Sequence, residues 1–331
     1  MWVECWVNPR MFRGFAIFPM KAARIHSFGD PEVILIDEIP PPQPKENQVL
    51  LKVAASSLNH IDLSIRAGEM KLLTQFKMPR TLGFDVAGEV MACGAGVTSF
   101  LPGDRVAGMT GLSSGGAAEF CCIRQSQVTR VPDAVSLLDA AAVPLAGATA
   151  LQALRGFAHL RANQRVLING AAGGVGSYAV QIAKIIGAHV TAVCRSEHFD
   201  HIRALGADHC IDYQNDSLTF APEKYDVVFD AAAKLNVQQL NALVEHGGQF
   251  VTTRPGPNQL VESLIEFFRG AVHLHFILTK PRPGDFALLL RLIADGRLKP
   301  CIARSFPLVE AAAAHRFFET QSVAGKILLL A

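Results

Sequence analysis

The stretch from Arg165 to Gly176, RVLINGAAGGVG, decides the fold class. An apolar run, expected to form a buried strand, leads into a glycine-rich turn and then into Ser177–Ile186, which has helical periodicity. The turn has the form A-x-G-x-x-G, with Ala171 where the first glycine of a dinucleotide fingerprint usually stands. Small residues let a pyrophosphate approach the backbone, and the helix N-terminus offers N–H groups and a positive dipole end. The stretch therefore predicts a dinucleotide site at Ala171, Gly173, Gly174, Val175 and Gly176; a turn that serves only helix–sheet packing is the alternative.

Strands and helices alternate on both sides of this turn. Nearly continuous apolar runs predict strands, and helical periodicity between them predicts crossover helices, as in a parallel sheet covered on both faces. The expected strands are 166–169, 190–194, 227–230 and 249–253, and the expected helices are 138–157 and 177–186. This region is therefore predicted to be a doubly wound α/β domain.

The residues before 138 have a different pattern, with short strands separated by Gly and Pro turns. We expect strands at 21–25, 33–38, 49–55, 83–93 and 104–106, with a short helix at 61–66, which indicates a compact, mostly β domain. After about residue 283 we expect helices at 286–295 and 309–320 and a final strand at 326–330. Residues 1–19 have no such pattern and are expected to be a poorly ordered extension.

Composition limits the class of protein. The 331 residues correspond to about two domains at about 150 residues each, and 50% are hydrophobic against 18% charged, which argues against disorder. The net charge of +2 without a basic stripe argues against nucleic-acid binding. The longest apolar stretch, 140–151, is too short to span a membrane. The 7 scattered cysteines, with no C-x-x-C pair, fit reduced thiols in a cytoplasmic protein.

The residue at the end of the second parallel strand discriminates between the two nicotinamide dinucleotides. Arg195, followed by Ser196, stands nineteen residues after Gly176, where an acidic residue would bind the ribose of NAD(H). A guanidinium pairs with a 2′-phosphate, so NADP(H) is favoured. Glu197 leaves NAD(H) open, since a shift of two residues would bring it to the ribose, and Arg195 as a solvated loop cation is the other alternative.

The chain resembles the medium-chain dehydrogenase/reductase superfamily, and within it the zinc-free quinone oxidoreductases related to zeta-crystallin. The resemblance runs from about Met20 to the C-terminus. It is carried by NQRVLINGAAGGVG at 163–176 with Gln181 and Lys184, N-x-x-D-x-x-x-R-x-G at 59–68, GFDVAG at 83–88, PGDRV at 102–106, G-x-T-A at 147–150, LGAD at 205–208 and GK at 325–326. It implies a GroES-like domain formed by residues 20–145 and 284–331, a Rossmann domain at 146–283, and an active site between them.

The zinc ligands of the related alcohol dehydrogenases are missing. The Cys of their Cys-His-Thr-Asp-like run is Asn59 here, and the His of their Gly-His-Glu motif is Phe84. The four-cysteine structural lobe is absent too, the nearby thiols being Cys121 and Cys122. Tetrahedral zinc cannot be built from Asn, Phe and a stray His, so no metal is predicted and metal-assisted alcohol oxidation is disfavoured.

The resemblance implies an NADPH-dependent reductase that passes a hydride to a quinone or an α,β-unsaturated carbonyl, whose conjugation already spreads the developing charge. It implies that Asn59, the one catalytic candidate, and Thr149 lie near the nicotinamide, with Gly173–Gly176 on the pyrophosphate. It further implies that Arg195, Ser196 and Tyr213 surround the 2′-phosphate, and that Lys326 contacts the cofactor.

Other polar residues near Asn59 are assigned structural roles. Asp62 and Arg66 have i,i+4 spacing, which favours a structural pair over proton delivery. His60 is interpreted as a locally satisfied histidine, and Asp85 as a turn anchor. No general acid is identified, and solvent can protonate the product.

Alternatives remain open at this stage. A zinc-free alcohol or aldehyde dehydrogenase and an enoyl-thioester reductase belong to the same superfamily, whereas an NADPH-binding structural or interaction protein is of another class. The partner is predicted to be a small-molecule substrate. A homodimer is expected because, in the family, a strand in the region 273–278 pairs across a dimer.

Overall fold

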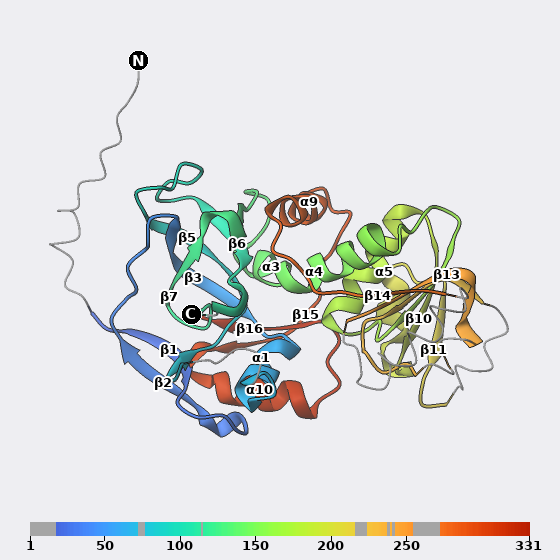
Figure 1. The fold of residues 1–331 in the computed structure, drawn as a ribbon, viewed down its shortest axis with the longest axis horizontal. Helices are drawn as coiled ribbons and strands as arrows, with labels where there is room; N and C mark the ends of the chain where they lie inside the picture. Colours follow the sequence, from blue (N-terminus) through green and yellow to red (C-terminus); the bar gives the residue numbers. More distant parts are fainter. Residues whose placement is uncertain are drawn as a thin grey trace, which may run out of the picture.

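The computed structural model describes residues 18–71, 77–113, 115–215, 224–236, 239, 242–253 and 272–331. The extension predicted for residues 1–19 lies outside them except for Phe18 and Pro19. Figure 1 shows a parallel sheet at one end of the molecule and mostly antiparallel sheets at the other, with α3 (Leu137–Ala141) and α4 (Pro144–Leu151) between them. Each helix in the described residues is too short or too polar to span a bilayer.

In the described part of the chain, the parallel sheet has six strands in the order β11-β10-β9-β12-β13-β14. Their bounds are β9 Arg165–Asn169, β10 His189–Cys194, β11 His209–Asp212, β12 Tyr225–Asp230, β13 Val244–Thr252 and β14 Val272–Phe276. Every neighbouring pair is parallel. Numbered by position along the chain, the order is 3-2-1-4-5-6, which is the doubly wound arrangement that binds dinucleotides where the strand order reverses, here between β9 and β12. The predicted α/β class is confirmed.

Helix α5, Gly174–Ile186, begins three residues before the predicted start at Ser177. Gly173 is extended, with φ −69° and ψ 174°, and serves as N-cap, while the Ser177 amide donates to the Gly173 carbonyl at 2.9 Å. The helix ends at Ile186 and is capped by Gly187, whose φ of 94° is left-handed. Because the turn residues themselves form the first helical turn, the glycines lie at the positive end of the helix.

Among the described residues, the second half of the molecule is built on two further sheets, one larger and one smaller than the parallel sheet. A seven-stranded sheet has the order β15-β16-β3-β5-β6-β8 with β7 on β3, and a three-stranded sheet has the order β2-β1-β4. The strands are β1 Met20–Ile25, β2 Ile34–Ile39, β3 Gln48–Ser57, β4 Arg80–Thr81, β5 Asp85–Cys93, β6 Arg105–Met109, β7 Phe120–Arg124, β8 Val128–Arg130, β15 Ile302–Pro307 and β16 Lys326–Leu330. The described residues also form helices α1 (His60–Ala67), α9 (Pro283–Ala294) and α10 (Ala311–Thr320), and α6 (Phe199–Ala204) between β10 and β11 of the parallel sheet.

The single helix predicted at 138–157 is wrong. The structure has α3 at Leu137–Ala141, α4 at Pro144–Leu151 and a π-helical turn at Gln152–Phe157. Pro144 has no N–H and its ring clashes with the preceding turn, so a helix cannot run through it but can begin there. The domain boundary predicted after residue 145 falls within α4, and the division into domains stays a prediction.

The residue just before β16, Gly325, connects the two halves directly. The Gly325 amide donates to the Ala172 carbonyl at 2.9 Å, and Gly173 forms an isolated parallel bridge with Gly325. Lys326, the first residue of β16, therefore stands beside the glycine-rich turn.

Candidate active site

The glycine-rich turn is shaped by contacts between backbone atoms. Gly170 has a φ of +77°, and the amides of Gly170 and Ala171 both donate to the Val193 carbonyl at 3.0 Å. A Cβ on Gly176 would lie 2.1 Å from the Gly170 carbonyl oxygen, so this glycine is required for the helix to pack against the turn. Packing alone is therefore enough to require a glycine at position 176. This agrees with the alternative in which the turn serves only helix–sheet packing.

The other turn residues fit a dinucleotide pyrophosphate. A Cβ on Gly173 would be 3.4 Å from the Gly170 oxygen, the only atom within 4 Å of it among the described residues. The first amides of a helix cannot be satisfied by its own carbonyls, and here they belong to Gly174, Val175 and Gly176. This end of α5 lies at the reversal point of the strand order, where a dinucleotide phosphate is expected.

The residues predicted to surround a 2′-phosphate follow strands β10 and β11. Arg195 Nε donates to the Tyr213 hydroxyl at 2.9 Å, and its Nη1 is 3.7 Å from Glu197. The Arg195 side chain is 40% exposed. The Ser196 hydroxyl is engaged with Asp212, whose pKa is lowered by hydrogen bonds from the Gln214 amide and from Ser196. Arg195 and Tyr213 therefore present a cation and a hydroxyl side by side, whereas Ser196 faces a carboxylate.

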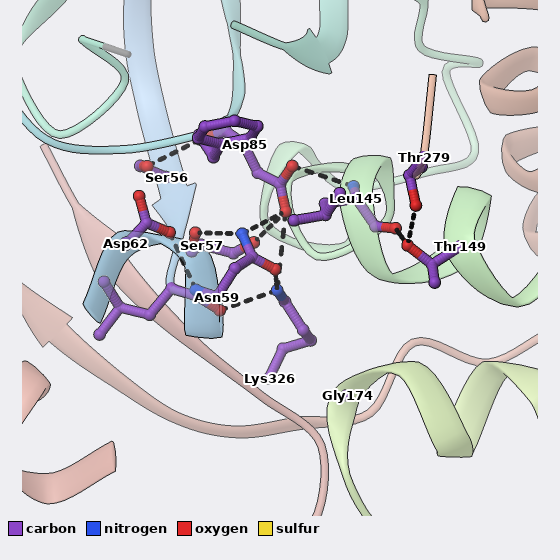
Figure 2. Close-up of polar contacts among 12 residues, drawn as sticks. Ser56, Ser57, Asn59, Asp62, Asp85, Leu145, Thr149, Gly174, Thr279 and Lys326 are labelled. Carbon is purple, nitrogen blue, oxygen red and sulfur yellow. Dashed lines mark hydrogen bonds and ion pairs between the residues drawn. The ribbon is translucent and has the colours of Figure 1, made fainter. Parts of the chain in front are cut away.

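Asn59, Asp85 and Lys326 meet in a buried cluster, shown in Figure 2. Asn59 Nδ2 donates to Asp85 Oδ2 at 3.0 Å, and Lys326 Nζ donates to Asn59 Oδ1 at 2.5 Å. Lys326 Nζ lies 3.6 Å from Asp85 Oδ2. We call these three residues, with the Ser57 hydroxyl and the Leu145 amide that also donate to Asp85, the Asp85 cluster.

The polar groups of Asn59 and Lys326 are directed to the protein itself. The Lys326 ammonium donates to the Leu58 carbonyl at 2.8 Å as well as to Asn59, while Asn59 Nδ2 also reaches the Ser57 carbonyl at 3.2 Å. The methylenes of Lys326 lie against the turn, where a Cβ on Gly174 would come within 2.7 Å of its Cδ. Direct contact of Asn59 and Lys326 with a cofactor stays a prediction.

Burial changes the acidities in and around the Asp85 cluster. Burial raises the pKa of Asp85, although Lys326 and its hydrogen bonds oppose the change. Burial lowers the pKa of Lys326, opposed by Asp85 and Asp62. Burial, followed by the charge of Asp85, raises the pKa of Asp62 to about 7. The three groups are therefore electrostatically coupled: Lys326 favours the charged form of both carboxyl groups, whereas Asp85 disfavours the charged form of Asp62.

Thr149, on α4, is linked to a residue that the sequence did not indicate. Its Oγ1 donates to the Leu145 carbonyl at 2.6 Å and lies 2.6 Å from Thr279 Oγ1. Thr279 follows β14 in the chain, so this contact joins α4 to the end of the parallel sheet (Figure 2). No motif marks Thr279 in the sequence.

Two structural roles inferred from the sequence are wrong. Asp62 and Arg66 do not pair: Asp62 Oδ2 accepts from the Asn59 amide at 3.0 Å, whereas Arg66 donates to Glu319 at 2.5 Å. Asp62 caps the start of α1 and Arg66 pairs with a carboxylate from a distant part of the chain, so their i,i+4 spacing does not bring them together. Asp85 is the centre of the buried cluster rather than a turn anchor. A signal is present in the sequence, since Asp85 opens an apolar strand that has one other acid, Glu89, and Lys326 is the one base in the apolar run 326–330.

His60 has a local packing contact, with its ring 4.9 Å from that of Phe318. Phe84, at the position of a zinc-binding histidine in the alcohol dehydrogenases, packs in the hydrophobic core. Over the described ranges, no three His, Cys, Asp or Glu side chains come together in a way that could hold a metal ion. The sequence-based prediction of a zinc-free site stays a prediction.

Comparison with known proteins identifies the family. The family described as alcohol dehydrogenase GroES-like domain matches residues 45–133, and that described as zinc-binding dehydrogenase matches residues 205–329. The chloroplast envelope quinone oxidoreductase homolog of Arabidopsis thaliana is 34% identical over 304 residues, covering 88% of this chain and 92% of the relative. The chloroplastic NADPH-dependent alkenal/one oxidoreductase of the same plant is 32% identical, covering 94% and 79%.

A solved structure gives the same result. The Escherichia coli quinone oxidoreductase complexed with NADPH superposes with a TM-score of 0.85 at 26% identity, covering 94% of this chain and 100% of that one. These matches confirm the predicted combination of a GroES-like domain with a parallel α/β sheet. The chain therefore belongs to the quinone oxidoreductase family of medium-chain dehydrogenases/reductases.

Proposed function

We propose that the chain is an NADPH-dependent, metal-independent reductase that transfers a hydride to a quinone or an α,β-unsaturated carbonyl compound. The observation that carries the proposal is the placement of Arg195 at the end of β10, next to the β9–α5 turn of a sheet with the dinucleotide-binding strand order. The relatives named as quinone and NADPH-dependent alkenal/one oxidoreductases support the cofactor and the acceptor class.

In this mechanism the chain binds and orients, and NADPH, when bound, supplies the hydride. The amides at the start of α5 bind the pyrophosphate, and Arg195 pairs with the 2′-phosphate. Asn59 and Thr149 define the nicotinamide end of the site, so that the acceptor is held at a reacting distance. The acceptor's own conjugation spreads the negative charge, and solvent protonates the product.

The remaining proposals concern metal, assembly and location. The replacement of both zinc-binding side chains by Asn59 and Phe84 supports a reaction without zinc. Strand β14 is an edge of the six-stranded sheet among the described residues, and this supports a homodimer formed by pairing of the 273–278 region. The six cysteines in the described part of the chain are free thiols, and this supports the cytoplasm.

The test is the rate of NADPH oxidation with a quinone, a 2-enal and an acyl thioester as acceptors, with Arg195→Glu as the control variant. We expect turnover with the quinone or the enal, and a strong loss in the variant with NADPH but not with NADH. Turnover confined to the acyl thioester would replace the proposal with an enoyl-thioester reductase. Tight NADPH binding without oxidation by any acceptor would favour a binding protein. Alcohol oxidation that appears only when Zn²⁺ is added would overturn the proposal of a metal-independent reaction.

A further inference from the structure

Asp85 is the point at which four segments of the chain meet. Its Oδ2 accepts from the Ser57 hydroxyl at 2.8 Å and from Asn59 Nδ2 at 3.0 Å, next to Lys326 Nζ at 3.6 Å. Its Oδ1 accepts from the Leu145 amide at 2.9 Å. The side chain is fully buried, and Figure 2 shows these partners arranged around the one carboxylate. A buried carboxylate with this many donors is fixed in position.

The contact with Leu145 extends this fixation to α4. Leu145 is the second residue of α4, so Asp85 places a negative charge at the helix N-terminus, where it is stabilising. Thr149 lies one turn further along, and its hydroxyl donates to the Leu145 carbonyl at 2.6 Å. The position of Thr149 relative to Asn59 is therefore set through a single side chain.

We propose that Asp85 is a positioning residue whose carboxylate holds Asn59, Lys326 and the start of α4 in one frame at the nicotinamide end of the site. The inference rests on the proposed function, because Asn59 and Thr149 are the residues assigned to that end. Asp85 acts through these two residues rather than by touching the reacting atoms.

An amide cannot replace the carboxylate in this frame. Asp85 accepts hydrogen bonds at both oxygens, whereas a side-chain amide has one accepting atom, its oxygen, and one donating atom, its nitrogen. With its oxygen toward the Leu145 amide, the amide nitrogen would face Asn59 Nδ2 and the Lys326 ammonium, which are both donors. Lys326 would then be a buried charge without its counter-ion.

The loss of charge also changes the titration of Lys326. The groups that act on Lys326 are Asp85 on β5 and Asp62 on α1, and Tyr178 on α5 senses the charge of Asp85. Because Asp85 opposes the effect of burial on the pKa of Lys326, its removal lowers that pKa further. In the variant, Lys326 therefore loses its proton at a lower pH than in the wild type. Once Lys326 is neutral, the positive charge that Asn59 Oδ1 accepts from is lost.

The experiment compares Asp85→Asn and Asp85→Glu with the wild type. For the amide variant we expect kcat to fall about 10- to 100-fold, the loss expected for a misplaced reacting group, while the Kd of NADPH changes less than about threefold. We expect the basic limb of its kcat–pH profile to move to lower pH, and the Asp85→Glu variant to return that limb toward the wild-type position because it retains the charge. A primary isotope effect with NADPH deuterated at C4 shows whether the hydride step is the one slowed.

Asp208→Asn is the matched control. Asp208 also accepts from a lysine, Lys184 at 2.9 Å, and from a backbone amide, Val190 at 2.7 Å. Lys184 lies in the last turn of α5, about 15 Å along the axis from the turn at Gly174. We expect the rate and the pH profile of this variant to match those of the wild type.

Two further measurements separate positioning from folding and from the proposed function. The double variant Asp85→Asn/Lys326→Met removes the unpaired charge, so we expect it to regain thermal stability without regaining kcat. Titration of labelled lysine by NMR in the chain without NADPH reports the pKa of Lys326 independently of turnover. The inference is overturned if Asp85→Asn keeps kcat within twofold, if the Lys326 titration does not move, or if the double variant regains the wild-type rate. A wild type inactive with every acceptor would instead overturn the proposed function, while the lysine titration still tests the frame.

Discussion

Asp62 is expected to make this protein less stable as the pH rises from 4 to 7. Its pKa is raised from 3.8 to about 7, because its carboxyl group is buried and lies near Asp85. One of its oxygens accepts from the Asn59 amide at 3.0 Å, and the other is buried with no hydrogen-bond partner in the described part of the chain. Between pH 4 and 7 the unfolded chain releases this proton while the folded chain retains it, so rising pH favours unfolding.

The magnitude follows from the difference between the two pKa values. A difference of about three pH units corresponds to roughly 4 kcal/mol at about 1.4 kcal/mol per unit. Asp62→Asn removes the titration and keeps an oxygen for the Asn59 amide. Relative to the wild type, the variant should therefore gain about 2 to 4 kcal/mol in free energy of unfolding between pH 4 and pH 8.

The assay is urea unfolding followed by circular dichroism at pH 4, 6 and 8. Asp104→Asn is the control: burial alone would raise the pKa of Asp104, but hydrogen bonds from the Leu101 amide and Arg130 hold it below its usual value. Asp104 is ionised in both states above pH 5, so its variant should differ from the wild type by a constant amount from pH 6 to 8. A pH-independent difference for the Asp62 variant would show that the pKa of Asp62 is not raised in the folded chain.

Three further outcomes are expected. Arg195→Glu should weaken NADPH binding at least tenfold in fluorescence titrations, as expected for a lost charge-assisted contact of about 1.5 to 3 kcal/mol. The affinity for NADH should change little. Equal losses of affinity for both dinucleotides would contradict the assignment of Arg195 to the 2′-phosphate. Gly176→Ala should lower the free energy of unfolding by about 2 kcal/mol and weaken NADPH binding, because its Cβ would meet backbone at 2.1 Å, whereas Gly156→Ala, with open space around it, should do neither. Glu319→Gln should cost about 3 kcal/mol in chemical denaturation, since Arg66 is 3% exposed and would lose its counter-ion; an unchanged denaturation midpoint would show that the pair contributes nothing.

The parallel sheet could be predicted from the sequence because its signal is local. Strands covered on both faces are continuous apolar runs. The turn at 170–176 is recognisable because its small residues allow the tight backbone path that it needs. The break in the helix predicted at 138–157 was also local, since Pro144 marks it. Strand β13 begins at Val244, five residues before the predicted start: residues 244–248 lack an apolar pattern, yet Val244 pairs with Tyr225 on β12 and Gly248 pairs with Val272 on β14.

The Asp85 cluster could not be predicted by the same reasoning. Its hydrogen bonds join positions as far apart as Asn59 and Lys326, which are 267 residues apart. Asp62 and Arg66 show the same limit, since the counter-ion of Arg66 is 253 residues away rather than one helical turn away. Spacing along the chain predicts which groups can meet within one helix, whereas the tertiary fold decides which groups do meet.

The hydrogen bond from Gly325 to Ala172 has a consequence for how this protein can be recombined with its relatives. The dinucleotide turn is bridged by a glycine that directly precedes β16 of another sheet, has a φ of +110° and would place a Cβ 2.3 Å from the Cys301 carbonyl oxygen. A chimera that exchanges only residues 146–283 would combine the turn of one protein with the bridging glycine segment of the other. Grafting the cofactor preference of one relative onto another therefore requires the segment around residues 301–326 to travel with the parallel sheet.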